Sequence, residues 1–90
     1  MKTIFSELSL NQYSEWLSSN NPKTAKRIIA LIKDIHRNGF MKGIGKPEPL
    51  KHQLQGCWSR RINSEHRLVY EIFEENIHIL SLRGHYFIAD

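Results

Sequence analysis

Two hydrophobic periodicities divide this 90-residue chain into a helical part and a β-rich part. Between residues 10 and 38, apolar side chains recur every three or four positions, which is the spacing of amphipathic helices. Later, short runs rich in β-branched and aromatic residues alternate with turn-forming residues, a pattern typical of an antiparallel meander. A first strand is expected at residues 2–5. The order β-α-α-β-β-β predicts one α+β domain over residues 1–90, a helical hairpin packed on a four-stranded, largely antiparallel sheet. The later strands are expected at residues 57–62, 66–73 and 77–83.

The predicted helices have recognisable starts. Ser9, followed three residues later by Gln12, forms a capping box and predicts a first helix over residues 10–18. Asn21 is a capping residue and Pro22 suits the first position of a helix, so a second helix is expected to start there. The apolar face of this second helix consists of Ala25, Ile28, Ile29, Ile32 and Ile35.

A segment rich in glycine and proline, residues 41–49, separates the two parts of the chain. Two glycines and two prolines among nine residues predict a loop rather than a strand. Pro47 and Pro49 flank Glu48 and restrict the backbone on both sides of it. With both helices on one face of the sheet, we expect this loop to roof the opposite face and to leave a cleft there.

Positive charge is concentrated in one part of the chain. The sequence has 13 Lys or Arg against 9 Asp or Glu, a formal net charge of +4 and a pI near 9.5. Residues 42–67 contain six of these cations and two glutamates, so this segment carries the whole excess. Such a balance favours an anionic partner, either a nucleic acid or an acidic protein.

Other features narrow the class of protein. Cys57 is the single cysteine, so no disulfide forms within the chain, and we expect a small buried residue rather than a nucleophile. The histidines lack the spacing of zinc ligands, so neither a metal site nor another cofactor is expected. The chain has no apolar run suited to a signal peptide or a membrane span, so the cytoplasm is the expected location, without membrane contact.

Three sequence strings carry a family resemblance. KPEPLKH begins at Lys46, GCWSRRINSEHRLVYEI begins at Gly56, and RGHY begins at Arg83. Together they closely resemble the YoeB/Txe toxins of the RelE/ParE superfamily, and the likeness covers nearly the full chain. This resemblance implies an endoribonuclease that cuts messenger RNA in the decoding site of the ribosome. It also implies that a YefM-type antitoxin holds the enzyme inactive. A homodimer is left open.

The resemblance also implies roles for individual residues. The family's general base falls on Glu48, its general acid on His85 and its transition-state arginine on Arg67. Lys51, Arg61 and Tyr86 match positions that contact or orient the RNA, and Lys46 joins them as an RNA-binding candidate from the basic segment. Attack by the 2′-hydroxyl needs a base, an acid for the leaving 5′-oxygen and positive charge at the phosphorane, which these groups would supply without a metal ion.

The register of the last two expected strands decides whether these groups can meet. A two-residue turn would pair Arg67 with Leu82, and a three-residue turn would pair it with Arg83. Because side chains alternate between the two faces, the site requires the longer turn, a bulge, or a His85 that swings clear of the sheet. The sequence leaves these alternatives open.

Simpler interpretations compete with each of these roles. Taken alone, Glu48 is a solvated loop carboxylate, and Arg67 is a solvated strand arginine or a partner of Glu65. Trp58, Tyr70 and Phe73 are expected in the core rather than as platforms for bases. Family members commonly end at the tyrosine, whereas residues 87–90 follow it here and are expected to pack on the sheet edge or the second helix.

Two other functions remain as alternatives. A ParE-like toxin shares the scaffold but acts on a DNA topoisomerase, and that branch lacks the acid–base set. A noncatalytic basic module would bind nucleic acid or an acidic protein. Replacing Glu48 by Gln separates these possibilities, because cleavage should fail while pure binding should survive.

Overall fold

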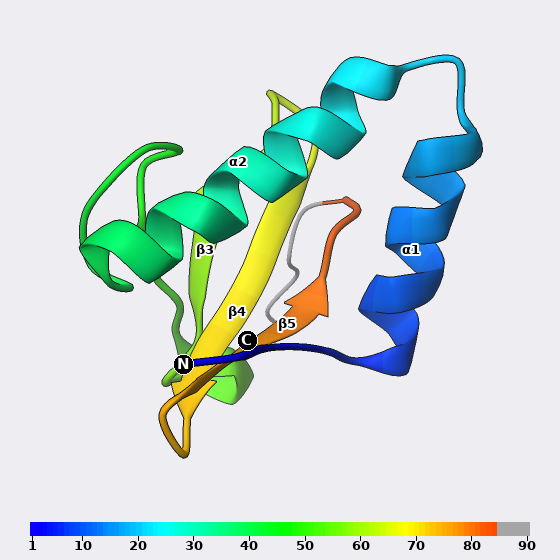
Figure 1. Ribbon diagram of the computed structural model, residues 1–90. Coiled ribbons are helices and arrows are strands. Elements are labelled where there is room, and N and C mark those ends of the chain that lie inside the picture. The colour runs from blue at the N-terminus through cyan, green and yellow to red at the C-terminus, as the bar shows by residue number, and fades with distance from the viewer. Residues whose placement is uncertain (85–90) are drawn as a thin grey trace.

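The computed structural model describes residues 1–84. The expectations for His85, Tyr86 and residues 87–90 therefore lie outside the described residues. Within residues 1–84, two long helices and one short 3-10 helix accompany five strands, and Figure 1 shows their arrangement. In chain order the elements are β1 (Thr3–Phe5), α1 (Glu7–Ser18), α2 (Pro22–Asn38), β2 (Glu48–Pro49), η1 (His52–Leu54), β3 (Trp58–Arg61), β4 (Arg67–Phe73) and β5 (Asn76–Ser81).

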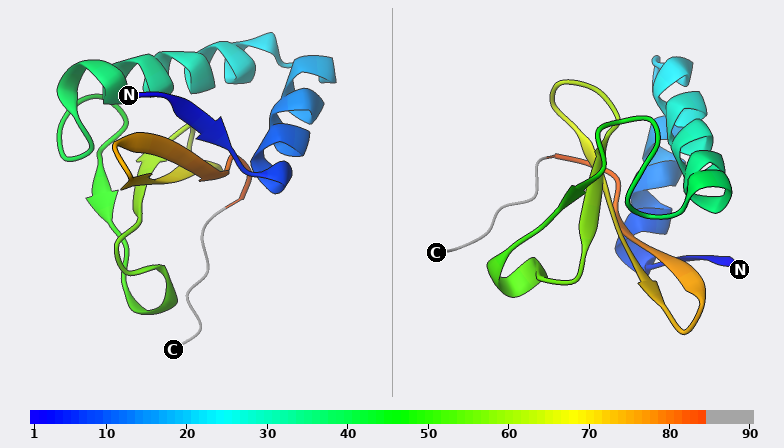
Figure 2. Two further views of the ribbon diagram at one scale, coloured as in Figure 1. Left: turned by 60° about the horizontal axis from the view of Figure 1, so that its bottom comes forward. Right: turned by 90° about the vertical axis from the view of Figure 1, so that its left-hand side faces the viewer.

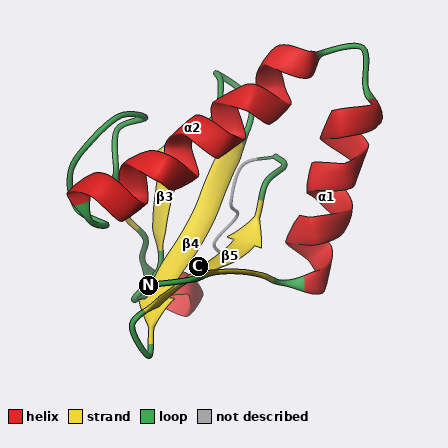
Figure 3. Ribbon diagram, viewed as in Figure 1, coloured by secondary structure: helices red, strands yellow, loops and turns green. Residues whose placement is uncertain are grey.

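The strands form one mixed sheet in the order β1-β5-β4-β3-β2. β1 lies parallel to β5, and the other neighbours are antiparallel. Both long helices cover the same face of this sheet (Figure 3), so the predicted α+β architecture is confirmed. The predicted number of four strands is wrong, because Glu48–Pro49 pairs with Ser59 and Trp58 as a fifth, edge strand. A proline is tolerated there because an edge strand has one side without ladder hydrogen bonds.

Helix α1 starts earlier than the capping box predicted. Its N-cap is Ser6, whose extended backbone precedes Glu7 and whose Oγ accepts a hydrogen bond from the Ser9 N–H at 3.1 Å. Ser9 is fully buried, and its hydroxyl donates to the Ile79 carbonyl at 2.8 Å. The hydroxyl predicted to cap the helix therefore joins α1 to β5 instead.

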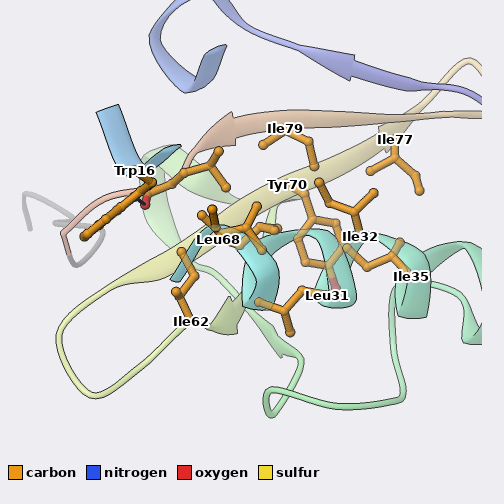
Figure 4. Packing of buried hydrophobic residues seen from close by; sticks show 12 residues of the cluster. Trp16, Leu31, Ile32, Ile35, Ile62, Leu68, Tyr70, Ile77 and Ile79 are labelled. Carbon is orange, nitrogen blue, oxygen red and sulfur yellow. Dashed lines mark hydrogen bonds between the residues drawn. The ribbon is translucent and has the colours of Figure 1, made fainter. Parts of the chain in front are cut away.

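The main core lies between α2 and the sheet (Figure 4). α2 contributes the predicted apolar face, extended by Leu31, while Ile29 is only half-buried. Of the aromatic residues predicted in the core, Tyr70 is fully buried and Trp58 is half-buried. The prediction that Phe73 lies in the core is wrong, because this residue is 55% exposed at the end of β4. The buried members of this cluster are Trp16, Ala25, Ile28, Leu31, Ile32, Ile35, Ile62, Leu68, Tyr70, Ile77, Ile79 and Leu82.

The face of the sheet opposite the long helices has a smaller apolar cluster of its own. Leu50, Cys57 and Val69 are buried together, with Leu54 and Leu80 packed against them. Val69 alternates with core residues of β4, so this cluster lies across the sheet from α2. The segment that contains η1 covers part of this face (Figure 2, right). The predicted roof over this face is therefore formed by residues 50–57 rather than by residues 41–49.

The connection between β4 and β5 combines a short turn with a bulge. Glu74 and Glu75 form a two-residue turn, both with positive φ, as a type I′ hairpin requires. Tyr70 pairs with Ile79, but the preceding residue of β4, Val69, pairs with Ser81. Leu80 is therefore an extra residue in β5. Of the alternatives that the sequence left open, the longer turn is absent and the bulge is present between β4 and β5, while the position of His85 lies outside the described residues.

Candidate functional site

Arg60 organises the loop that leads to Glu48. Its side chain is fully buried on the helix-covered side of β3, where every guanidinium nitrogen donates a hydrogen bond. The acceptors are Tyr70 Oη (3.1 Å), Asp34 Oδ2 (2.5 Å) and the carbonyl oxygens of Ile44 (3.2 Å), Gly39 (2.8 Å) and Lys42 (2.7 Å). The loop after α2 is thus tied to the end of that helix and cannot cover the opposite face of the sheet.

Electrostatics and tight packing hold this loop in place. Partial burial raises the pKa of Asp34, but the hydrogen bonds from Arg60, the Ile44 N–H and Asn38 outweigh it, so the pKa lies below its usual value. A Cβ on Gly45 would approach the Leu31 side chain to 2.7 Å, so a larger residue there would require the buried Leu31 side chain to shift. The Gly45 φ of +80° also favours glycine.

The register of the sheet places Glu48 and Arg67 on the same, open face. Glu48 pairs with Ser59, and Ser59 pairs with Val69, so these three side chains form one row across the sheet. Arg61 pairs with Arg67 two residues further along. Two strand spacings and a two-residue offset put the Cα atoms of Glu48 and Arg67 about 12 Å apart. A carboxylate and a guanidinium on side chains of this length can approach one bound phosphodiester from two sides.

Two arginines lie directly opposite each other on this face. Arg61 is exposed and Arg67 is half-buried. The next pair on the same face of these two strands, Ser59 and Val69, carries no charge that could offset the two arginines. Like charges at a cross-strand pair destabilise a sheet by up to about 1 kcal/mol. The pair therefore costs stability in the free protein, and an anion bound between the two guanidinium groups would relieve that cost.

The turn between β3 and β4 holds one end of the Arg67 guanidinium. Nη1 donates to the carbonyl oxygens of Asn63 (2.8 Å), His66 (3.2 Å) and Ser64 (3.4 Å). Within residues 1–84, Nε and Nη2 make no hydrogen bond. A guanidinium held at one nitrogen keeps its position while its other donors remain able to bind an anion.

The remaining predicted residues lie around this face. Lys46 is exposed, with a positive φ of 52°, in the loop just before β2. Lys51 is exposed immediately before η1. The structure therefore brings Glu48, Arg61 and Arg67 together on one face, with Lys46 and Lys51 flanking β2. His85 and Tyr86 follow Gly84, whose carbonyl accepts a hydrogen bond from the Arg67 N–H at 3.0 Å.

Two residues near the site had no predicted role in it. Arg60 alternates with Trp58 and Ile62, so strand periodicity could have placed it on the apolar face, where a buried arginine needs a carboxylate partner. No comparable signal marked His66, whose ring accepts a hydrogen bond from the Gly84 N–H at 2.7 Å. That contact depends on a pairing between segments that the sequence did not determine.

Other candidate features are separate from this face. Burial and the neighbouring Glu71 carboxylate raise the pKa of the Cys57 thiol, which does not favour a nucleophilic thiolate. Two cavities of about 320 and 330 Å³ adjoin α2, and neither contains a predicted site residue. In the described part of the chain, no group of three or more His, Cys, Asp or Glu could hold a metal ion. None of the helices within residues 1–84 is long and apolar enough to cross a membrane.

Fold and sequence are both shared with known bacterial toxins. The structures of the YoeB–YefM complex and of the YoeB dimer from Staphylococcus aureus match this chain with TM-scores of 0.87 and 0.88. Their identities are 46% and 45%, and each match covers 96% of this chain and 98% of the other. Toxin YoeB of Synechocystis sp. is 57% identical over 86 residues, 96% of this chain and 98% of the relative. The molecule is therefore of the class of small bacterial toxins with a helical hairpin on a mixed sheet.

The family follows from the sequence match. The model of the YoeB-like toxins of bacterial type II toxin–antitoxin systems matches residues 5–86. The chain belongs to this family.

Proposed function

We propose that this toxin is an endoribonuclease that cleaves messenger RNA on the ribosome. The 2′-hydroxyl of one nucleotide attacks the adjacent phosphodiester, so that a 2′,3′-cyclic phosphate forms and the 5′-oxygen leaves. Glu48 removes the proton of the hydroxyl, Arg67 stabilises the charge of the phosphorane, and His85 protonates the leaving oxygen. Lys46, Lys51, Arg61 and Tyr86 bind the RNA.

The observation that supports this proposal best is the shared face of Glu48 and Arg67. They come from strands that are not neighbours, and the pairing of both with β3 puts them on one side of the sheet. A base and a fixed cation on one face, about 12 Å apart at the backbone, suit a phosphodiester held between them. The unfavourable pair of Arg61 and Arg67 is an independent reason to expect an anion there.

The ribosome is proposed as the setting because the site is sparse and open. Glu48 and Lys51 are exposed, so the protein alone encloses little of a substrate on this side. Prior positioning of a message can contribute several kcal/mol to catalysis, on the order of 7 or more in favourable cases. We infer that the decoding site supplies this orientation and that the toxin acts in the cytoplasm.

The proposed protein partners follow from the relatives. One match is the YoeB–YefM complex from S. aureus and another is the YoeB dimer from the same organism. We infer that a YefM-type antitoxin binds and inhibits this chain and that the chain is able to form a homodimer. The exposed cations of the open face suit an acidic segment of such an antitoxin.

A cleavage assay on programmed ribosomes tests the proposal. Message bound in the decoding site is mixed with wild-type toxin, Glu48→Gln or Arg67→Gln, and single-turnover rates and product ends are measured. Loss of the base or of the fixed cation should lower the rate about 10²- to 10⁴-fold. The wild-type products should carry 2′,3′-cyclic phosphates, and naked RNA should be cut far more slowly.

Glu65→Gln is the matched control, because it removes one exposed glutamate from the turn before β4 and makes the same change of charge. It should cleave like the wild type. Full activity of Glu48→Gln would refute the proposed base. Tight binding of RNA or of ribosomes without any cleavage by the wild type would favour the noncatalytic module instead.

A further inference from the structure

The backbone of Gly84 is held at both of its polar groups by two consecutive residues. The Gly84 N–H donates to Nδ1 of His66 at 2.7 Å, and the Gly84 carbonyl accepts from the Arg67 N–H at 3.0 Å. A backbone N–H can only donate, so Nδ1 of His66 must be the acceptor and the ring must be neutral with its proton on Nε2. This contact specifies one tautomer of one histidine.

Helix α1 holds the two residues before Gly84. Oε1 of Gln12 accepts from the Leu82 N–H at 2.6 Å, and Nε1 of Trp16 donates to the Leu82 carbonyl at 2.8 Å. The Arg83 guanidinium lies over the Trp16 ring, 4.8 Å from its centroid. Residues 82–84 are therefore bound from α1 on one side and from the start of β4 on the other, an arrangement called here the 82–84 clamp.

Within this clamp the His66 ring cannot turn freely. It packs edge-on against Trp16, with ring centroids 4.9 Å apart and planes at 73°, and the residue is half-buried. Trp16 itself is 7% exposed and anchored through its indole N–H. The tryptophan thus holds the imidazole in the orientation that presents Nδ1 to Gly84.

We propose that His66 is a positioning residue of the ribonuclease site. It fixes the position of Gly84, the residue before His85 in the sequence, relative to Arg67. This inference rests on the proposed function of those two residues. Gly84 has a φ of +73° and, as a glycine, could adopt many other conformations without this hydrogen bond. A displacement of about 1 Å at a reacting group can cost about 10²-fold in rate.

The other explanation is that His66 only fills space beside Trp16. In that case any side chain of similar volume would serve, and the hydrogen-bond acceptor would be irrelevant. The positioning role requires an acceptor at the place of Nδ1. Asn offers its Oδ1 close to that place, Gln offers its Oε1 nearer to Nε2, and Leu fills the space without any acceptor.

The experiment compares His66→Leu and His66→Asn in the ribosome-bound cleavage assay. The Leu variant should lower the maximal single-turnover rate roughly 10- to 100-fold while the half-saturating ribosome concentration stays within about twofold. The Asn variant should recover the rate to within about threefold of the wild type. If the Leu variant does not fold in a thermal melt, His66→Gln takes its place as the variant with a misplaced acceptor.

His78→Leu is the matched control. His78 is a histidine of β5 that, like His66, is half-buried and packs edge-on against an aromatic ring, here Phe73 at 5.8 Å. Its replacement should leave the cleavage rate unchanged. Equal rates for folded His66→Leu and wild type would overturn the proposal. So would a folded His66→Asn as slow as the Leu variant, or an effect confined to the half-saturating concentration.

A readout independent of activity separates this inference from the proposed function. The amide proton of Gly84 should exchange slowly with solvent in the wild type and in His66→Asn, and faster in His66→Leu, as measured by NMR. Unchanged exchange in the Leu variant overturns the positioning contact. If Glu48→Gln is fully active, the proposed function fails, whatever the Gly84 amide shows.

Discussion

At the scale of single residues, Arg60 connects a buried charge to the loop that leads to Glu48. A guanidinium removed from water loses its hydration, and only a nearly complete set of acceptors compensates for that loss. Four of its five acceptors lie on α2 or on the loop after it, so the loop can leave only if the arginine loses its partners. Lysine could not replace it, because a single ammonium has three donors and no planar fork.

The first prediction concerns the carboxylate of this network. Asp34→Asn leaves the buried guanidinium without a counter-charge and should lower the free energy of unfolding at pH 7 by about 2–4 kcal/mol. Because the pKa of Asp34 is lowered in the folded state, its contribution is complete above the unfolded value of 3.8 and is lost as the pH falls through the lower folded value. Urea denaturation from pH 7 down to pH 3 should therefore show the two proteins converging in stability below about pH 4.

Glu74→Gln, in the exposed turn between β4 and β5, is the control for the loss of one negative charge. Its stability should follow the wild type at every pH. A difference between Asp34→Asn and wild type that stays constant down to pH 3 would contradict the role of the ionised carboxylate.

The sequence predicted the candidate catalytic residues better than it predicted the residues that hold them in place. Glu48 and Arg67 could be named because the strings around them resemble a family, and the structure places both on the open face. Their catalytic roles remain a prediction. Arg60 belongs to the basic segment, but it is completely buried, so it is not available at the surface to an acidic partner. Residue type gave its charge, but only the alternation along β3 gave its side of the sheet.

At the scale of elements, regular periodicity was informative and local irregularity was not. The helices and the three later strands could be predicted because each repeats its pattern over several residues. Strand β2 has only two residues, one of them a proline, so it exists through its pairing with β3 rather than through its own propensity. The bulge at Leu80 likewise depends on partners on β4 and α1, which no local window contains.

The second prediction concerns the contact between α1 and this bulge. Ser9→Ala removes the hydroxyl that donates to the Ile79 carbonyl, the residue just before Leu80, and leaves that buried acceptor with one bond fewer. The cost should be about 1–2 kcal/mol, because a buried hydrogen bond is lost. In a domain of this size that corresponds to a fall of roughly 5–15 °C in the midpoint of thermal unfolding.

Ser14→Ala, an exposed position on the same helix, serves as the comparison. It should leave the midpoint unchanged or raise it slightly, because alanine favours the helix. Equal midpoints for Ser9→Ala and Ser14→Ala would show that the bulge does not depend on α1.

At the scale of the whole molecule, the two faces of the sheet have different characters. The long helices cover one face (Figure 2), and the main core lies beneath them. The other face carries a small apolar cluster and cations of the basic segment. Arg60 does not contribute to this surface. The cations available to a docking partner on this side are therefore Lys46, Lys51, Arg61 and Arg67.

The third prediction concerns association with the proposed antitoxin. If an acidic chain docks on the cationic face, its association rate should fall steeply as salt rises, while its dissociation rate should change little. Arg61→Gln and Lys51→Gln should each reduce this salt dependence, measured by stopped-flow or biosensor kinetics. Lys33→Gln, an exposed position on α2 across the sheet, should retain the full dependence. If the association rate does not depend on ionic strength, or if all three variants change its salt dependence equally, the antitoxin binds to another surface.

The extra residue at Leu80 determines which face of the sheet Leu82 occupies. Leu82 shares the helix-covered core with Ile77 and Ile79, which strict alternation would forbid, and the bulge is what makes this possible. If the ladder were regular with Leu80 retained, Leu82 would lie on the opposite face of the sheet. Deleting Leu80 would remove the bulge and restore strict alternation, with Leu82 still on the core side. Inserting one residue beside Leu80, with the bulge kept, would turn Leu82 away from the core. The stretch between Ile79 and Leu82 should therefore tolerate the loss of one residue better than the gain of one.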